Sequence, residues 1–211
     1  MDNKIENYQY WIDRDIKDKR VDWNHPSKSW IEGYWKSVNH PHRSQIVKEL
    51  KKIEFDSLLE VGCNAGANIA RIRNEFEIDD LNLAGCDVNK DSILFAQSKL
   101  PDVLWRVGNA KELVFVDKEY DVVLADAVLM YADPDEFNDI ISEMDRVAKK
   151  AIIICDWFNE IEEIKDEHWC RDYKSLLEEM GFDAYKVKIT KWPTKSGNWE
   201  RNGWIFVGIR K

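Results

Sequence analysis

The stretch from residue 57 to residue 76 constrains the fold of this chain more than any other. Ser57–Val61 is a short apolar run with the length and branching of a buried strand. A loop with two glycines follows, and then an amphipathic stretch with Ile69, Ile72 and Phe76 at helical spacing. A strand, a glycine-containing turn and a helix bring backbone N–H groups and a helix N-terminus up to a nucleotide-like ligand.

The residues of the loop indicate which ligand fits. A dinucleotide fingerprint reads G-x-G-x-x-G, but the matching positions Gly62, Asn64 and Ala67 hold one glycine. Glu60 lies two residues before Gly62, where a carboxylate would repel a pyrophosphate. S-adenosylmethionine carries a sulfonium, an ammonium and no phosphate, so an acid at this position attracts it. Asn64 replaces a glycine, and Asn is the residue that best tolerates a positive φ after glycine.

Glu60-x-Gly62-x-Asn64-x-Gly66 resembles the first motif of class I S-adenosylmethionine-dependent methyltransferases, with Asn in place of the middle Gly. The resemblance covers about residues 55–211. It implies an α/β fold: a Rossmann-like doubly wound sheet, mostly parallel, with strand order 3-2-1-4-5-7-6 and an antiparallel last strand. A glycine-rich turn of some other α/β protein is the alternative reading of this motif.

The resemblance also implies where the cofactor binds. Asp87 ends the second expected strand (81–87), where an acid binds the ribose hydroxyls in both methyltransferases and NAD enzymes. It could instead cap the following helix. Gly108-Asn109-Ala110 follows the third strand (103–107), where the family usually has Gly-Asp-Ala against the adenine. The cofactor contacts expected from the resemblance are Glu60, Gly62, Asn64, Gly66, Asn68, Asp87, Val88, Asn109, Ala110, Asp126 and Arg43. Arg43 is either the partner of the cofactor carboxylate or a solvated helix residue.

The expected catalytic residues come from strand ends and from the segment before the first strand. The fourth (120–125) and fifth (151–155) strands end beside Asp126 and Asp156, on the edge where open α/β sheets bind ligands. A hydroxyl acceptor needs a general base facing the methyl group. We favour Asp156 and His42, with Asp126 and His168 as further candidates; each could also be a cap, a salt-bridge partner or a core residue.

Aromatic residues gather at both ends of the chain. Residues 1–54 are expected to form a helical segment beside the domain of residues 55–211. Its aromatic residues either pack it onto the sheet or form a lid over cofactor and substrate. They are Tyr8, Tyr10, Trp11, Trp23, Trp30, Tyr34 and Trp35. Residues 159–168 and 191–203, which include Trp192 and Trp199, read as loops, while 182–190 and 204–209 alternate like strands. The expected substrate contacts are Trp30, Tyr34, Tyr131, Trp157 and His168.

A narrower resemblance points to small bacterial class I methyltransferases of mostly unassigned substrate. Its elements are Ser37 to Arg43, Asp126 to Leu129, Asp156-Trp157 and His168 to Tyr173.

Composition limits the class of function. The chain has 211 residues, enough for one domain with a substantial core, and 44% of them are hydrophobic. A net charge of −9 argues against a broad nucleic-acid surface, and no apolar stretch approaches a membrane span. Four cysteines without a C-x-x-C pair fit a reduced, cytoplasmic setting, and His40-Pro41-His42 lacks companions for a metal site.

The sequence therefore predicts an S-adenosylmethionine-dependent methyltransferase that acts on a small molecule or sugar-like metabolite, by O- or N-methylation. A protein or RNA methyltransferase and a non-catalytic cofactor-binding module remain open, as does a homodimer. The product would be S-adenosylhomocysteine. No metal is expected.

Overall fold

The computed structural model describes residues 7–14, 29–76, 81–165, 168–190 and 198–211. Trp23 and Trp192 lie outside these residues, as does the side chain of Tyr8. The helices are α1 (Asn7–Asp13), α2 (Trp30–Lys36), η1 (Ser37–Asn39), α3 (Pro41–Leu50), α4 (Ala67–Phe76), α5 (Lys90–Lys99), η2 (Leu129–Tyr131), α6 (Pro134–Val147), α7 (Tyr173–Glu179) and α8 (Asn198–Asn202). The strands are β1 (Ser57–Val61), β2 (Asn82–Asp87), β3 (Leu104–Val107), β4 (Tyr120–Asp126), β5 (Ala148–Trp157), β6 (Glu163–Lys165), β7 (His168–Cys170), β8 (Phe182–Lys188) and β9 (Gly203–Arg210).

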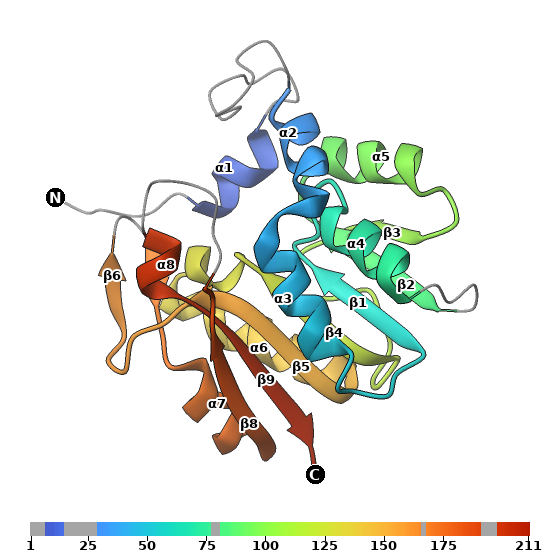
Figure 1. The fold of residues 1–211 in the computed structure, drawn as a ribbon. Coiled ribbons are helices and arrows are strands. Elements are labelled where there is room, and N and C mark those ends of the chain that lie inside the picture. The colour runs from blue at the N-terminus through green and yellow to red at the C-terminus, as the bar shows by residue number, and fades with distance from the viewer. Residues whose placement is uncertain (1–6, 15–28, 77–80, 166–167, 191–197) are drawn as a thin grey trace, which may run out of the picture.

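Seven strands form one twisted sheet in the order β3-β2-β1-β4-β5-β9-β8 (Figure 1). The first five run parallel, and β9 lies antiparallel between β5 and β8. The predicted order 3-2-1-4-5-7-6 is confirmed, because β8 and β9 are the sixth and seventh strands of the large sheet.

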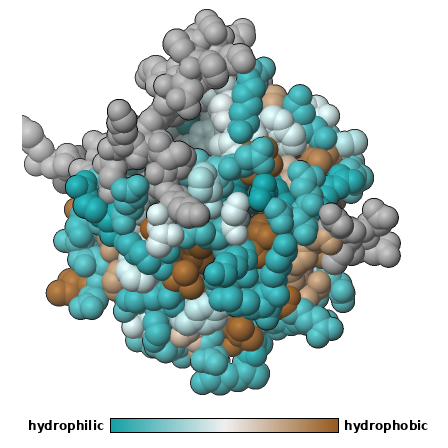
Figure 2. All heavy atoms as spheres, viewed as in Figure 1, coloured by the Kyte–Doolittle hydropathy of each residue, from teal (hydrophilic) through white to brown (hydrophobic). Residues whose placement is uncertain are grey.

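The two faces of the sheet are buried by different helices, as the alternation of side chains along each strand requires. Leu58, Val122 and Ile153 pack with α3, α4 and α5 on one face. Leu59, Val123 and Ile152 pack with α6 and α7 on the other. All of these strand residues are fully buried, which explains why the central strands read as apolar runs rather than as alternating patterns. The face of the molecule in Figure 2 is mostly hydrophilic, with hydrophobic residues in small patches.

Two segments expected to be loops contain regular structure. Within 159–168, β6 begins at Glu163, and it pairs antiparallel with β7 as a separate two-stranded sheet. Within 191–203, α8 occupies residues 198–202. Both are short and polar in sequence, and tertiary contacts hold them: Cys170 of β7 is buried in a cluster with Met130 and Trp157, against which Trp199 of α8 also packs. Local periodicity does not report such contacts.

Parallel strands place their carboxyl ends on one edge of the sheet. Val61, Asp87, Asp126 and Trp157 end β1, β2, β4 and β5 on that edge. The same edge carries η2, and α1 reaches it through Trp11, whose ring lies 5.4 Å from that of Tyr131. None of the described helices is both long enough and apolar enough to cross a bilayer.

Candidate active site at the carboxyl edge of the sheet

The loop after β1 has the backbone geometry that its sequence predicts. Gly62, Asn64 and Gly66 have φ values of 70°, 47° and 78°, all in the left-handed region. Asn64 therefore takes a conformation that is strained for most residues, as its place in the motif predicted. The N–H groups of Gly62 and Cys63 donate to the Cys86 carbonyl oxygen at 2.8 and 3.1 Å, which ties the loop to β2.

Close packing explains why two of these positions hold glycine. A Cβ on Gly62 would lie 2.3 Å from Cγ2 of Val128, which follows β4. A Cβ on Gly66 or on Gly85 would lie 2.5 or 2.4 Å from the ring of Trp105 on β3. The loop is therefore packed between the residues after β4 and an indole from β3.

Asp87 fixes the other end of the loop. Its Oδ2 accepts a hydrogen bond from the Asn64 N–H at 2.8 Å, and its Oδ1 accepts one from the Asn89 N–H at 2.8 Å. Burial raises the pKa of Asp87, although backbone N–H donors oppose the shift. Each oxygen keeps a second lone pair, so the carboxylate can still accept from a ribose. The side chain that caps α5 is that of Asn89, which accepts from the Ser92 N–H, and not that of Asp87.

Asn109 and Ala110 lie in the turn after β3, beside this carboxylate. The Gly108 N–H donates to the Asp87 carbonyl oxygen at 3.0 Å, and Oδ1 of Asn109 accepts from the Lys111 N–H at 3.0 Å. Val88 is partly buried next to Asp87. The predicted adenosine contacts thus come from adjacent turns at the ends of β2 and β3.

A buried polar cluster lies beside the loop, and it joins four elements: Glu60 of β1, Asn68 of α4, Asp126 of β4, and His42 with Arg43 of α3. Nδ2 of Asn68 donates to Oε1 of Glu60 at 2.7 Å and to Oδ2 of Asp126 at 2.9 Å. Nη1 of Arg43 donates to Oδ1 of Asn68 at 2.5 Å and to Oδ2 of Asp126 at 3.1 Å. His42, Arg43, Glu60 and Asn68 are buried, and only 6% of the Asp126 side chain is exposed.

The two carboxyl groups of the cluster have opposite pKa shifts. Burial pushes the pKa of Asp126 up, but its hydrogen bonds with His42 and Asn68 and the charge of Arg43 hold it well below its usual range. Burial raises the pKa of Glu60 to about 8, although the Asn68 hydrogen bond and the Arg43 charge oppose the shift. Asp126 is therefore ionised at neutral pH, whereas Glu60 is largely protonated.

The cluster leaves acceptor atoms for a ligand. Among the described residues, Oε2 of Glu60 has no hydrogen-bond partner, and Oδ1 of Asp126 meets no donor except the weak Cys155 thiol. A buried acceptor without a partner is costly, so a cation that donates hydrogen bonds fits here.

The side-chain nitrogens of Arg43 and His42 already have hydrogen-bond partners within the protein. Nε and Nη2 of Arg43 donate to the carbonyl and hydroxyl oxygens of Ser37 at 3.0 and 2.9 Å, in addition to the cluster bonds of Nη1. Arg43 is thus not a solvated helix residue. Nε2 of His42 lies 2.9 Å from Oδ2 of Asp126, and its Nδ1 pairs with His40. Burial lowers the pKa of His42, and burial with the neighbouring His42 lowers that of His40 to about 3, so both rings are neutral at pH 7.

Asp156 lies at the end of β5, directly before Trp157, which belongs to an aromatic cluster with Trp11, Tyr131 and His168. Oδ2 of Asp156 accepts from the Met130 N–H at 3.1 Å, and Oδ1 accepts from the Trp157 N–H at 3.2 Å. Burial raises its pKa to about 8. The His168 ring centroid lies 4.7 Å from that of Trp157 and 5.0 Å from that of Tyr131.

The structure brings the predicted substrate residues together. Trp30 lies 6.3 Å from Trp11 and 5.9 Å from Tyr34, so these rings continue the aromatic cluster. Sequence reasoning did not single out Arg14, whose guanidinium carbon lies 4.1 Å from the Trp30 ring. Nothing in the local sequence distinguishes Arg14 from the exposed arginines of the chain.

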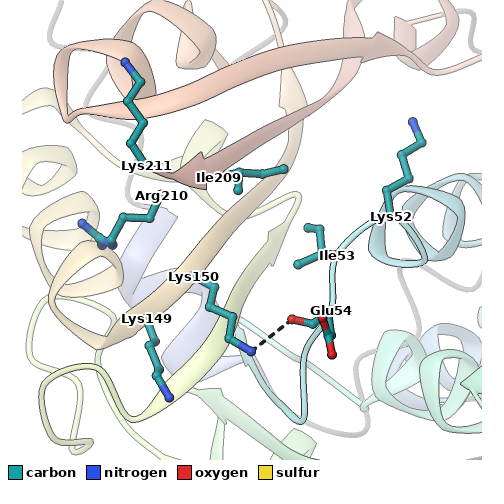
Figure 3. A pocket seen from close by; sticks show the side chains of 8 residues that line it. All are labelled: Lys52, Ile53, Glu54, Lys149, Lys150, Ile209, Arg210 and Lys211. Carbon is teal, nitrogen blue, oxygen red and sulfur yellow. Dashed lines mark hydrogen bonds between the residues drawn. The ribbon is translucent and has the colours of Figure 1, made fainter.

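A hollow of about 450 Å³ lies at the opposite edge of the sheet (Figure 3). It lies between the segment before β1, the start of β5 and the end of β9, and its basic residues are Lys52, Lys149, Lys150, Arg210 and Lys211. Most of these already have acidic partners, such as Asp121 for Lys150 and Asp145 for Arg210. None of the carboxyl-edge residues described above lines this hollow.

The described residues contain no group of three or more acidic, histidine or cysteine side chains placed to hold a metal ion.

Comparison with known proteins agrees with this geometry. Residues 58–151 match a family described as "Methyltransferase domain", a range that begins in β1 and ends in β5. A search of curated protein sequences found no significant match.

Solved structures share the fold at low sequence identity. A complex between the Haloferax volcanii Trm112 methyltransferase activator and a methyltransferase matches with a TM-score of 0.66 and 17% identity, over 85% of this chain and 93% of that one. Magnesium protoporphyrin IX methyltransferase from Synechocystis PCC 6803, with bound S-adenosylmethionine, gives 0.65 and 15%, over 100% and 98%. An S-adenosylmethionine-dependent methyltransferase from Aquifex aeolicus gives 0.64 and 16%, over 86% and 97%.

The domain match, the strand order and the loop at the end of β1 together define the class: residues 58–151 match a methyltransferase domain, and the chain has the fold of class I S-adenosylmethionine-dependent methyltransferases.

Proposed function

We propose that the protein transfers a methyl group from S-adenosylmethionine to an oxygen or nitrogen atom of a small molecule that binds against the aromatic cluster. The observation that carries the proposal is the position of Asp156 at the carboxyl end of β5: a buried carboxyl group with a pKa of about 8, which accepts from the N–H of Trp157, a member of the aromatic cluster. When bound, the cofactor supplies an electrophilic methyl group on a sulfonium.

The ends of β1 and β4 supply the residues that would hold the amino-acid part of the cofactor. The unpartnered Oε2 of Glu60 would accept from its ammonium, and Asp126 adds a second negative charge nearby. Asn68, Arg43 and His42 hold these two carboxyl groups in place. Asp87, Val88, Asn109 and Ala110, with the loop of Gly62, Asn64 and Gly66, would hold the adenosine.

Asp156 is the group that we assign as general base for a hydroxyl acceptor. Both of its oxygens accept backbone N–H groups, which fixes the carboxylate, and each retains a lone pair for a proton. A base with a pKa close to neutrality has both a useful ionised fraction and a strong affinity for the proton. His42 acts through Asp126 as a positioning residue, since both of its nitrogens have protein partners.

We further propose that the described part of the first 54 residues, residues 7–14 and 29–54, closes the site. Trp11 packs against Tyr131, and the Asn89 side chain donates to the carbonyl oxygens of Trp11 and Arg14 at 2.8 and 3.1 Å. These contacts hold the end of α1 over the carboxyl edge. A covering segment excludes water, which strengthens every electrostatic contact inside.

Two measurements test the proposal. Calorimetric titration with S-adenosylmethionine and NAD should show micromolar binding of the first and none of the second. Transfer of a labelled methyl group to a library of hydroxyl and amine metabolites should then identify acceptors, and Asp156→Asn should reduce kcat for hydroxyl acceptors at least tenfold.

Label that appears instead in protein or RNA from a lysate would reject the small-molecule assignment. Binding without any transfer would indicate a cofactor-binding module. Equal loss of kcat in Asp156→Asn and in Asp183→Asn, an exposed control on β8, would exclude a specific role for Asp156.

A further inference from the structure

Arg14 is a buried cation that the described protein does not fully satisfy. It follows α1 and is 5% exposed. Its guanidinium carbon lies 4.1 Å from the Trp30 ring, 5.1 Å from that of Trp11 and 5.4 Å from that of Tyr10. These cation–π contacts stabilise the charge, but they do not use the N–H donors that point along the plane of the group.

Two adjacent donors of this guanidinium lack a hydrogen-bond acceptor. Among the described residues, neither Nε nor Nη2 of Arg14 has a partner, although the side chain also hydrogen-bonds to Tyr34. Among the buried nitrogens in the same set of residues, Arg71 and Arg210 each leave one, Nε, without a partner. Nε and Nη2 form one edge of the planar fork, and that edge matches a carboxylate with two parallel hydrogen bonds. Arginine cannot lose its charge to lower the cost of burial.

Arg14 lies at the carboxyl edge of the sheet beside the loop. Its own carbonyl oxygen accepts from Nδ2 of Asn89, and the N–H of Asn89 in turn donates to Asp87. On the other side are Tyr34 and Tyr131: burial raises the pKa of both hydroxyls, and the charge of Arg14 partly opposes the shift in each. Arg14 therefore lies between the end of β2 and η2, at the place where cofactor and acceptor would meet.

Arg43 is a poorer candidate for the same task, because its donors are bound to Ser37, Asn68 and Asp126. A zwitterionic amino acid needs an acceptor for its ammonium and a donor pair for its carboxylate. The unpartnered Oε2 of Glu60 is such an acceptor, and the open edge of Arg14 is such a donor pair.

We propose that Arg14, and not Arg43, binds the carboxylate of the methionine part of the cofactor through Nε and Nη2. This inference rests on the proposed binding mode at Glu60. Arg14 would thereby determine specificity for a cofactor that carries a carboxylate, and it lies outside the range 58–151 matched by the domain family.

The test compares two ligands that differ in the carboxylate. S-adenosylhomocysteine carries it, whereas S-adenosyl-3-thiopropylamine keeps the amine and lacks it. Calorimetric titration should show that Arg14→Met weakens the binding of S-adenosylhomocysteine by about 10- to 100-fold, the range for a lost bidentate charged contact. Binding of the amine should change less than threefold. Arg14→Lys, which keeps the charge but not the fork, should fall between.

Two control variants separate this role from packing. Arg73→Met removes an exposed arginine that pairs with Asp102, and both affinities should stay unchanged. Arg43→Met should lower the melting temperature and weaken both ligands alike, because it opens the polar cluster. Melting curves of each Arg14 variant report whether the fold is intact.

Three results of these titrations would contradict the proposal. If Arg14→Met weakens both ligands equally, Arg14 acts through packing and the inference is wrong. If neither affinity changes, another group binds the carboxylate, and the inference is again wrong. If the wild-type protein binds neither ligand, the binding mode at Glu60 fails with it.

Discussion

Glu60 should make cofactor binding release a proton. The side chain is 2% exposed, Oε1 accepts from Asn68, and Oε2 has no partner among the described residues. Burial raises its pKa to about 8, and the charges of Asp126 and Asp87 add to the shift. An ammonium against Oε2 requires the ionised form, so the ligand must displace the proton that the unliganded protein holds.

The size of the effect follows from this pKa. At pH 7, a group with a pKa of about 8 is protonated in about nine of ten molecules, so binding should release about 0.9 proton. Ionising Glu60 at pH 7 costs about 1.4 kcal/mol, which is about tenfold in affinity. The Kd for S-adenosylhomocysteine should therefore fall about tenfold between pH 6 and pH 7, and level off above pH 8.

Titration calorimetry in buffers with different ionisation enthalpies counts the protons. Glu60→Gln keeps the shape of the side chain, and it should abolish the release and flatten the pH dependence of Kd. Glu75→Gln is the matched control, because Glu75 lies on α4 in ion pairs with Lys51 and Arg71, and it should release as many protons as the wild type. Equal release from Glu60→Gln and the wild type would show that another group titrates and would refute the reasoning.

Three further outcomes follow from the site. Gly62→Ala should lose most cofactor affinity, because its Cβ would lie 2.3 Å from Val128, whereas Gly33→Ala, with no atom within 4 Å of the added Cβ, should bind normally in the same titration. Asp87→Ala should weaken S-adenosylhomocysteine binding by about tenfold or more, since it frees the loop and removes a hydrogen-bond acceptor; unchanged affinity would place the ribose elsewhere. The folded protein holds the pKa of Asp156 at about 8, above its unfolded value of 3.8. The protonated Asp156 therefore contributes its full stability below pH 3.8, and this contribution is lost as the pH rises to 8. Between pH 5 and 8, the melting temperature of Asp156→Asn should fall less than that of the wild type.

The sheet could be predicted from the sequence because its central strands are buried on both faces. Ser57–Val61 is mostly apolar and Ala151–Cys155 is entirely so, and the residues that follow them lie at one edge by the geometry of parallel strands. The positive φ of Asn64 was predictable from its residue type. The antiparallel last strand came from the family resemblance, and not from a local pattern.

Side-chain orientation and the short elements could not be predicted in this way. The β6–β7 pair is held by contacts between residues far apart in sequence, such as Cys170 with Met130. Arg14 and Arg43 are alike in sequence terms, yet one has its donors bound by Ser37, Asn68 and Asp126, and the other keeps an open edge. Only tertiary packing separates them.

The indole of Trp105 lies where side chains at residues 66 and 85 would otherwise be. These three positions belong to β3, the loop after β1, and β2, so their identities depend on one another. A natural relative that acquires alanine at either glycine position should also carry a smaller residue in place of the tryptophan. Substitutions at these three positions should therefore occur together among homologues, even though the residues are separated by up to 39 positions in the chain.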